Sequence, residues 1–478
     1  MALRALRKLK FTTRYSQSIL NAEVSKNSLK CFAAYSTQEG DYADIVISGG
    51  GMVGAAMACA LANNNLLKDK RIILLEMDRD KGDFVLSEKY SNRTCALSPA
   101  TARLLSGFGA WQEIQSLRYH PVLRMQVWES CADAMITFNN DDMTEALAYI
   151  VENDIILAGI MKALKSFKDR VEVRYQAKAT SYSNIDSQSV SSTKLPYVEM
   201  TLNDGSKLRT KLLIGADGMN SNVRKTAGFH TINRDYGQTA VVAILELGDT
   251  TQNNTAWQRF LPTGPIALLP ISSNLSSLIW TTTTENSKHL LDIPSESFVD
   301  AVNDALWHER EKNQIAGQAL SVFRNLLQNV FPESQEQCRQ LPPTAINVVE
   351  KTRASFPLTL IHSSQYVKPR VVLIGDAGHR LHPLAGQGVN LGFGDVECLN
   401  EILTKAVQNG ADLGSLTHLL EFETQRQRHN VPVMATIDGL QRLYSTDFTP
   451  LVLIRALGLH AVHSLPVLKK FIISRASV

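Results

Sequence analysis

Three glycines near the start of the chain have the spacing of a loop that binds phosphate. Gly49, Gly51 and Gly54 directly follow the apolar stretch 44–48. In such a loop the first glycine permits a tight turn, the second lets backbone N–H groups approach a pyrophosphate, and the third lets the next helix pack closely on the strand. Residues 55–61 are small and apolar without a helix breaker, so they are predicted to form that helix, whose N-terminus favours negative charge.

A carboxylate stands at the end of a second apolar stretch. Residues 71–75 read Arg-Ile-Ile-Leu-Leu, and Glu76 follows them, 25 residues after Gly51. A carboxylate in that position accepts hydrogen bonds from the ribose hydroxyls of a dinucleotide. The two strands, the glycine loop, the helix and the acid together indicate a dinucleotide-binding unit. The glycine motif does not distinguish FAD from NAD, and a glycine-rich turn without a ligand is the alternative.

Two later apolar stretches also end in turns that carry an aspartate. Asp217 follows the first, residues 211–215, whereas Gly375 and Asp376 follow the second, residues 370–374. Taken singly, each aspartate could simply cap a turn. Taken together, the three strands are expected to end at the same place. Their turns would then contact one extended cofactor, at its pyrophosphate, at its middle and at its far end.

A glycine-rich stretch follows the third turn. It contains Gly386, Gly388 and Asn390, just after Pro383. We expect this stretch to begin a helix, whose free N–H groups could stabilise negative charge on a reduced flavin ring. The three turns and this helix favour FAD as the cofactor, with Asn390 as a further contact.

The order of these motifs resembles that of a known enzyme family. The glycine loop, the Ala-Asp-Gly turn at 216–218 and the Gly-Asp turn at 375–376 are similar to those of FAD-dependent aromatic hydroxylases of the para-hydroxybenzoate hydroxylase class. The resemblance runs from about residue 42 to 440. Residues 149–153 (Tyr-Ile-Val-Glu-Asn) and 382–395 (beginning His-Pro-Leu-Ala-Gly-Gln-Gly) resemble the ubiquinone (coenzyme Q) biosynthesis branch, and the basic leader its mitochondrial members.

The resemblance also implies roles for single residues. Arg93 resembles the family arginine that contacts FAD, and a surface arginine is the alternative. The pair Glu152-Asn153 stands where many members have an arginine near FAD, so that contact is not carried over. His379 and His382 could relay a proton, but such histidines are more often structural, and neither is assigned a catalytic role.

The implied reaction is carried by the cofactor rather than by catalytic side chains. Reduced FAD forms a C4a-hydroperoxide with O2, which hydroxylates the ring of a polyprenyl phenol or benzoate intermediate, at C5. No catalytic residue and no metal is assigned. Since the chain has one dinucleotide fingerprint, electrons come from transiently bound NAD(P)H or, as the resemblance implies, from ferredoxin and ferredoxin reductase.

These motifs require an α/β fold that brings the three turns together. We expect a Rossmann-like FAD-binding domain, a second, mainly β-sheet substrate domain and a C-terminal helical segment. At least two of Trp257, Phe260 and Trp280 are expected in the core of the second domain. The FAD-binding domain takes residues 42–117, 150–228 and 351–440, the substrate domain takes 118–149 and 229–350, and the C-terminal apolar segment takes 441–478.

The two ends of the chain predict its location. Residues 1–41 read as a mitochondrial presequence and linker, since residues 1–40 carry a net charge of +5 and leave about −2 for the rest; a disordered basic tail is the alternative. The apolar C-terminal segment would lie on a membrane, contact a partner or pack on its own domain. No apolar run reaches the roughly 20 residues of a bilayer span. We therefore expect a peripheral protein on the matrix side of the mitochondrial inner membrane.

Composition excludes several other classes of protein. With 478 residues, 44% hydrophobic and 20% charged, the chain is globular rather than of low complexity. Its slightly acidic body offers no footprint for nucleic acid, and six cysteines without a CxxC pair argue against a zinc site. Two alternatives to a monooxygenase remain. One is a flavin-fold scaffold for other ubiquinone-biosynthesis proteins in a membrane-peripheral complex, and the other is a flavin oxidase or reductase.

Overall fold

The computed structural model describes most of the chain from residue 41 to residue 464. Residues 1–40 of the expected presequence and linker lie outside the described residues, as do residues 465–478 of the C-terminal segment, whereas Asp41, the last residue assigned to the linker, begins strand β1 (Asp41–Ser48). Within the described part, no helix has the length and apolarity to cross a membrane. The described ranges are 41–131, 134–139, 145–183, 197–248, 252–308, 340–382, 386, 388–446 and 448–464.

The first sheet is mostly parallel and buried on both faces. Side chains alternate along its central strand: Ile45 and Ile47 enter one apolar cluster and Val46 the cluster on the opposite face. Such two-sided burial explains why the strands are continuous apolar runs. The order is β18 (Val367–Lys368), β19 (Val371–Leu373), β11 (Lys207–Gly215), β1 (Asp41–Ser48), β2 (Ile72–Leu75) and β8 (Val171–Arg174), with β10 (Val198–Leu202) and β9 (Ala179–Ser183) extending from β11.

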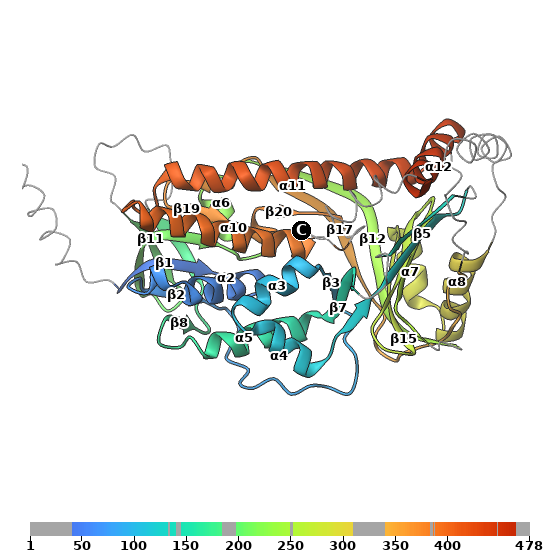
Figure 1. Cartoon of the computed structure of the whole chain (residues 1–478), viewed down its shortest axis with the longest axis horizontal. Coiled ribbons are helices and arrows are strands. Elements are labelled where there is room, and N and C mark those ends of the chain that lie inside the picture. Colours follow the sequence, from blue (N-terminus) through green and yellow to red (C-terminus); the bar gives the residue numbers. More distant parts are fainter. Residues whose placement is uncertain are drawn as a thin grey trace, which may run out of the picture.

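Helices cover this sheet and extend along the molecule. Figure 1 shows α11 running from the first sheet to the second, with α12 beyond its end. Helix α2 follows β1 after a short turn, which confirms the predicted strand, loop and helix. The helices are α2 (Met52–Asn63), α3 (Pro99–Gly107), α4 (Ala110–Leu117), α5 (Asn153–Lys165), α6 (Asn222–Thr226), α10 (Gly388–Gln408), α11 (Leu416–Tyr444) and α12 (Thr449–Ser464).

The second sheet has nine strands, and α7 (Thr284–Asp292) and α8 (Ser295–Trp307) contribute to the core on one of its faces. Trp257, Phe260 and Trp280 are all buried, as expected for sheet core. The strand order is β20 (His379–Arg380), β17 (Ala354–Ser363), β12 (Thr231–Leu247), β15 (Leu275–Thr283), β14 (Gly264–Pro270), β13 (Thr255–Leu261), β5 (Arg124–Glu129) and β6 (Met135–Asn139), with β16 (Ala345–Val348) beside β12.

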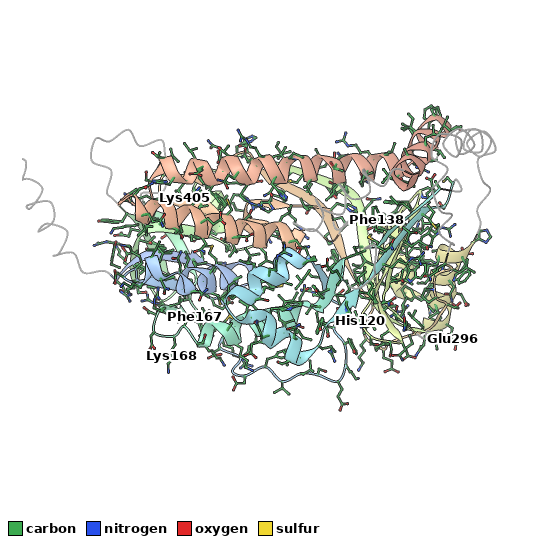
Figure 2. The ribbon with its side chains drawn as sticks, in the orientation of Figure 1. His120, Phe138, Phe167, Lys168, Glu296 and Lys405 are labelled. Carbon is green, nitrogen blue, oxygen red and sulfur yellow. The ribbon has the colours of Figure 1, made fainter. Side chains whose placement is uncertain are left out.

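Strand pairing crosses the boundaries proposed for the two domains. Strands β17 and β20 come from the segment 351–440, yet they belong to the second sheet. A third, small sheet joins β3 (Thr94–Leu97), β7 (Ala148–Glu152) and β4 (His120–Val122). His120, labelled in Figure 2, ties it to the loop before β13, because its Nε2 lies 2.6 Å from the carbonyl oxygen of Asn253. The division into two domains therefore stays a proposal.

The described part of the C-terminal segment packs on its own fold. Val452 and Ala456 of α12 are buried beside Ala134, at the start of β6. Arg455 donates to a carboxylate oxygen of Glu129 in β5 at 2.6 Å, and both side chains are almost fully buried. Among the three placements considered for this segment, packing on its own domain thus holds for this face of α12. Phe448, just before the helix, and Ile454 are exposed.

Candidate functional site

The glycine loop between β1 and α2 has two glycines that the fold itself requires. Gly49 has φ +109°, and a Cβ there would lie 2.5 Å from the carbonyl oxygen of Ala216. A Cβ on Gly54 would lie 1.9 Å from the carbonyl oxygen of Gly49. At Gly51, by contrast, a Cβ would meet no atom of the described residues within 4 Å. The loop therefore leaves open space at the N-terminus of α2, where a pyrophosphate would accept N–H hydrogen bonds.

The carboxylate of Glu76 lies beside this loop. Its Oε1 accepts a hydrogen bond from the backbone N–H of Asp78 at 2.7 Å. Its Oε2 would lie 2.3 Å from a Cβ on Gly50, so a side chain on Gly50 would displace the carboxylate. The position at the end of β2 is the one expected of a ribose-binding acid.

The other two turns meet the same loop. A Cβ on Gly54 would lie 3.1 Å from the Cβ of Ala216, in the turn after β11. Gly375, with φ +58°, would place a Cβ 3.2 Å from the side chain of Val53, and a Cβ on Gly392 in α10 would lie 2.7 Å from it. The N-termini of α2 and α10 and all three turns are thus brought together, as the sequence predicts.

Asp217 caps a helix, which was the alternative to a cofactor contact. Its Oδ2 accepts from the backbone N–H groups of Asn222 and Val223 at 2.7 and 3.2 Å, at the start of α6. Its Oδ1 is buried and has no hydrogen-bond partner among the described residues. One carboxylate oxygen is therefore used by the fold, and the other is unpaired in the turn that adjoins the glycine loop.

Asp376 lies in the short 3-10 helix η2 (Gly375–Ala377), and its carboxylate is exposed. The pKa of Asp376 is raised above its ordinary value, because desolvation by the surrounding protein outweighs the opposite effects of the positively charged Arg380 and of the nearby His379. An exposed acid at the end of a buried strand is free to bind a ligand. The cofactor contact predicted for Asp376 thus fits the geometry.

A buried ionic network fixes the turn that carries Asp376. Asp395 accepts from the backbone N–H of Gly375 at 2.8 Å, from His379 at 2.6 Å and from Arg426 at 2.7 Å. Burial raises the pKa of this carboxyl, but His379 and Arg426 outweigh it and hold the pKa at about 2. His379 is therefore a structural partner of Asp395, as expected for such histidines.

His382 lies two residues beyond β20 and is also buried. It has no hydrogen bond to either ring nitrogen within the described residues, and burial lowers its pKa to about 4, so the ring is neutral at physiological pH. Its ring meets that of Tyr236 edge to face, with centroids 5.0 Å apart. No catalytic role follows from these contacts.

Asn390 uses its side chain to join α10 to the β3–α3 connection. Its Nδ2 donates to the carbonyl oxygen of Ala96 at 2.9 Å, and its Oδ1 accepts from Ser98 N–H and from the hydroxyl of Thr101, both at 2.9 Å. What the structure shows for Asn390 is thus positioning of the helix start. At Gly388, the first residue of α10, a Cβ would meet nothing within 4 Å among the residues that the structure describes.

Gly386 and Arg93 complete the predicted set. Gly386 has φ +61°, and a Cβ there would lie 3.5 Å from the Cβ of Ala96, so Gly386 lies next to β3. Arg93 directly precedes β3, and its side chain is exposed. Its carbonyl oxygen accepts from the backbone N–H of Asn153 at 2.9 Å. The predicted FAD contacts of both residues stay predictions.

The residues fit an FAD molecule better than a metal. Among the described residues, space is open next to Gly51 and Gly388 at two helix N-termini, and Asp217, in the turn beside Gly49, has one carboxylate oxygen without a partner. Over the described ranges, no group of three or more histidine, cysteine, aspartate or glutamate side chains could hold a metal ion. Sequence reasoning assigned no role to Asp395 or Arg426. The signal that could have identified Asp395 is that it is the single acid in the mainly apolar stretch 389–396.

Comparisons with known proteins agree with this geometry. The family model described as an FAD binding domain matches residues 42–317 and 336–434. The mitochondrial ubiquinone biosynthesis monooxygenase COQ6 of Danio rerio is 49% identical over 442 residues, covering 92% of this chain and 91% of that protein. The Homo sapiens protein of the same name is 49% identical, covering 91% of this chain and 92% of that protein.

Solved structures share the fold at low sequence identity. The probable FAD-dependent monooxygenase pqsL from Pseudomonas aeruginosa has a TM-score of 0.62 at 18% identity, covering 88% of this chain and 100% of that one. The p-nitrophenol 4-monooxygenase PnpA from Pseudomonas putida has a TM-score of 0.63 at 16% identity, covering 91% and 99%. The predicted fold class and the FAD cofactor are confirmed. The chain belongs to the FAD-binding-domain family and, within it, to the COQ6 family of ubiquinone biosynthesis monooxygenases, which makes it an FAD-dependent monooxygenase.

Proposed function

We propose that this enzyme hydroxylates the aromatic ring of a polyprenyl phenol or benzoate intermediate of ubiquinone biosynthesis, at C5. The observation that carries the proposal is the convergence of three strand-end turns on two helix N-termini, with open space at Gly51 and Gly388. The names of the COQ6 relatives support the pathway. Bound FAD supplies the activated oxygen, as the C4a-hydroperoxide that the family resemblance implies.

The proposed cofactor contacts follow the three turns in order. The loop of Gly49, Gly51 and Gly54 binds the pyrophosphate, and Glu76 binds the ribose. Asp217 and Asp376 bind the middle and the far part of the cofactor, with Arg93 as a further contact. Gly386, Gly388 and the start of α10, where Asn390 fixes the helix, face the flavin ring, and the N–H groups there stabilise negative charge on it.

The remaining proposals concern electrons, partners and place. The electron donor is NAD(P)H or ferredoxin with ferredoxin reductase, and other ubiquinone-biosynthesis proteins are partners. The protein binds peripherally to the matrix side of the mitochondrial inner membrane. Exposed Phe448 and Ile454 at the C-terminal segment support contact with an apolar surface, and the relatives are named mitochondrial. This proposal is tested by sedimentation with vesicles of inner-membrane lipids. We expect the protein to sediment with the vesicles, and protein that stays in the supernatant would refute the membrane contact.

The proposed reaction is tested with labelled oxygen. Purified FAD-loaded protein, a reduced ferredoxin system and a polyprenyl phenol are incubated under ¹⁸O₂, and the product is analysed by mass spectrometry and NMR. We expect one labelled oxygen atom on the ring, at C5. Oxygen consumption with an unlabelled product would instead indicate a flavin oxidase, and label at another carbon would refute the C5 assignment.

The cofactor contact of Asp376 gives a separate prediction. Asp376→Ala should raise the Kd for FAD about tenfold to a hundredfold, because a hydrogen bond to a charged group contributes roughly 1.5–3 kcal/mol. Fluorescence titration of apoprotein with FAD measures the change. Asp204→Ala is the control, since Asp204 accepts from Ser206 in the turn between β10 and β11, at the amino end of β11. Equal Kd values for the wild type and Asp376→Ala would exclude the contact.

A further inference from the structure

Glu152 and Arg118 form a largely buried ion pair outside the glycine loop. Glu152 ends β7, and its side chain is 6% exposed, against 17% for Arg118. Arg118 donates from Nε to Oε2 at 2.7 Å and from Nη2 to Oε1 at 3.0 Å, which is a bidentate arrangement. Neither residue belongs to the glycine loop or to the two later turns.

The pair holds the segment that leads to Arg93. Arg118 donates to the carbonyl oxygens of Ser87 and Lys89 at 3.1 and 3.5 Å. Its guanidinium lies 3.8 Å from the ring centroid of Tyr90. From the other side, Oε1 of Glu152 accepts from the backbone N–H of Ser91 at 2.5 Å. Residues 87–91 form no regular secondary structure, so these contacts fix them in place.

Arg93 lies directly after the held segment. Residue 94 begins β3, where Thr94 pairs with Glu152 itself. Asn92 is anchored by a hydrogen bond from its Nδ2 to the carbonyl oxygen of Thr352 at 2.6 Å. The backbone on both sides of Arg93 is therefore fixed while its own side chain is exposed. Without the ion pair, cofactor binding would have to order residues 87–93 as well as the arginine side chain.

We propose that the Glu152–Arg118 pair is a clamp that positions Arg93 for FAD. The inference rests on the proposed contact between Arg93 and FAD. Glu152 and Arg118 act through Arg93 and are positioning residues rather than catalytic ones. An ion pair suits this purpose because a bidentate arginine and carboxylate fix direction as well as distance.

The clamp is tested by a double-mutant cycle in FAD affinity. The Kd for FAD is measured by flavin fluorescence with apoprotein of the wild type, Glu152→Gln, Arg93→Ala and the double variant. Glu152→Gln should raise the Kd about tenfold, because FAD must then order the segment. In the Arg93→Ala background the same change should raise it less than about twofold, since the arginine that depends on the clamp is absent. Glu113→Gln is the control, because the Glu113–Lys162 pair joins α4 to α5 at a position where Lys162 is exposed and Glu113 is only half-buried.

Each outcome decides between the two proposals. If Arg93→Ala leaves the Kd unchanged, both the arginine contact and the clamp are wrong. If Arg93→Ala weakens binding but the two effects add, the contact stands and the clamp is overturned. The circular dichroism spectrum of the Glu152→Gln apoprotein shows whether this variant folds as the wild type does. If it does not, the cycle is repeated with Arg118→Lys in place of Glu152→Gln, because a lysine cannot bind both carboxylate oxygens of Glu152.

Discussion

Gly51→Ala should raise the Kd for FAD about tenfold or more and leave the unfolding temperature of the apoprotein unchanged, whereas Gly54→Ala should damage the fold itself. The two glycines belong to one loop and differ in what a methyl group would meet. At Gly51 the methyl would meet no atom of the described residues within 4 Å apart from the adjoining chain, so it occupies only the space through which the pyrophosphate must pass. At Gly54 it would lie 1.9 Å from a backbone oxygen, and no side-chain rotation relieves that contact.

The expected loss for Gly54→Ala is roughly 3 kcal/mol or more of unfolding free energy, because α2 must move away from the turn at Gly49. Denaturant unfolding of apoprotein, together with FAD titration, separates the two effects. Gly107→Ala is the matched control, since a Cβ there meets nothing within 4 Å in helix α3, away from the loop. Its Kd should equal that of the wild type. Wild-type FAD affinity in Gly51→Ala would show that the pyrophosphate does not pass this residue.

The glycine loop shows why this part of the site could be predicted from sequence. Gly49 needs a positive φ and Gly54 needs a close approach to backbone, and glycine meets both demands. The buried parallel strands are likewise visible as continuous apolar runs. Both the glycine loop and the buried strands can therefore be recognised from a few neighbouring residues in the sequence.

The parts that sequence missed depend on contacts between distant segments. Strand β17 reads as a local β run, but nothing in it says that its partner is β12, more than a hundred residues earlier. The hydrogen bonds that Asp395 accepts come from a turn, a strand and a helix. The cofactor contact predicted for Asn390 from the glycine-rich stretch stays a prediction, but the sequence did not show that its side chain joins α10 to β3 and α3. The position of a residue in a motif identifies the region of the site, but it does not show which side-chain atoms already have hydrogen-bond partners within the protein.

Asp395→Asn should lower the unfolding free energy by about 3–5 kcal/mol, because it leaves the largely buried Arg426 without its counter-charge. The turn at Gly375 would also lose a carboxylate acceptor, so FAD should bind more weakly even where the variant is folded. Asp438→Asn is the control. Asp438 pairs with Arg234 and Arg442 at a more exposed position, and its replacement should change stability by less than about 1 kcal/mol.

The pH dependence gives this prediction a second readout. The folded pKa of Asp395 is about 2, below its ordinary value of 3.8, so its contribution is fully present above pH 4 and is lost as the pH falls through the folded pKa. The stability difference between the wild type and Asp395→Asn should therefore shrink as the pH falls from about 4 to about 2. Denaturant midpoints measured across this range decide the matter. A difference that stays constant down to pH 2 would mean that the loss arises from packing rather than from the charge of Asp395, and the ionic network would then not be what holds the Asp376 turn.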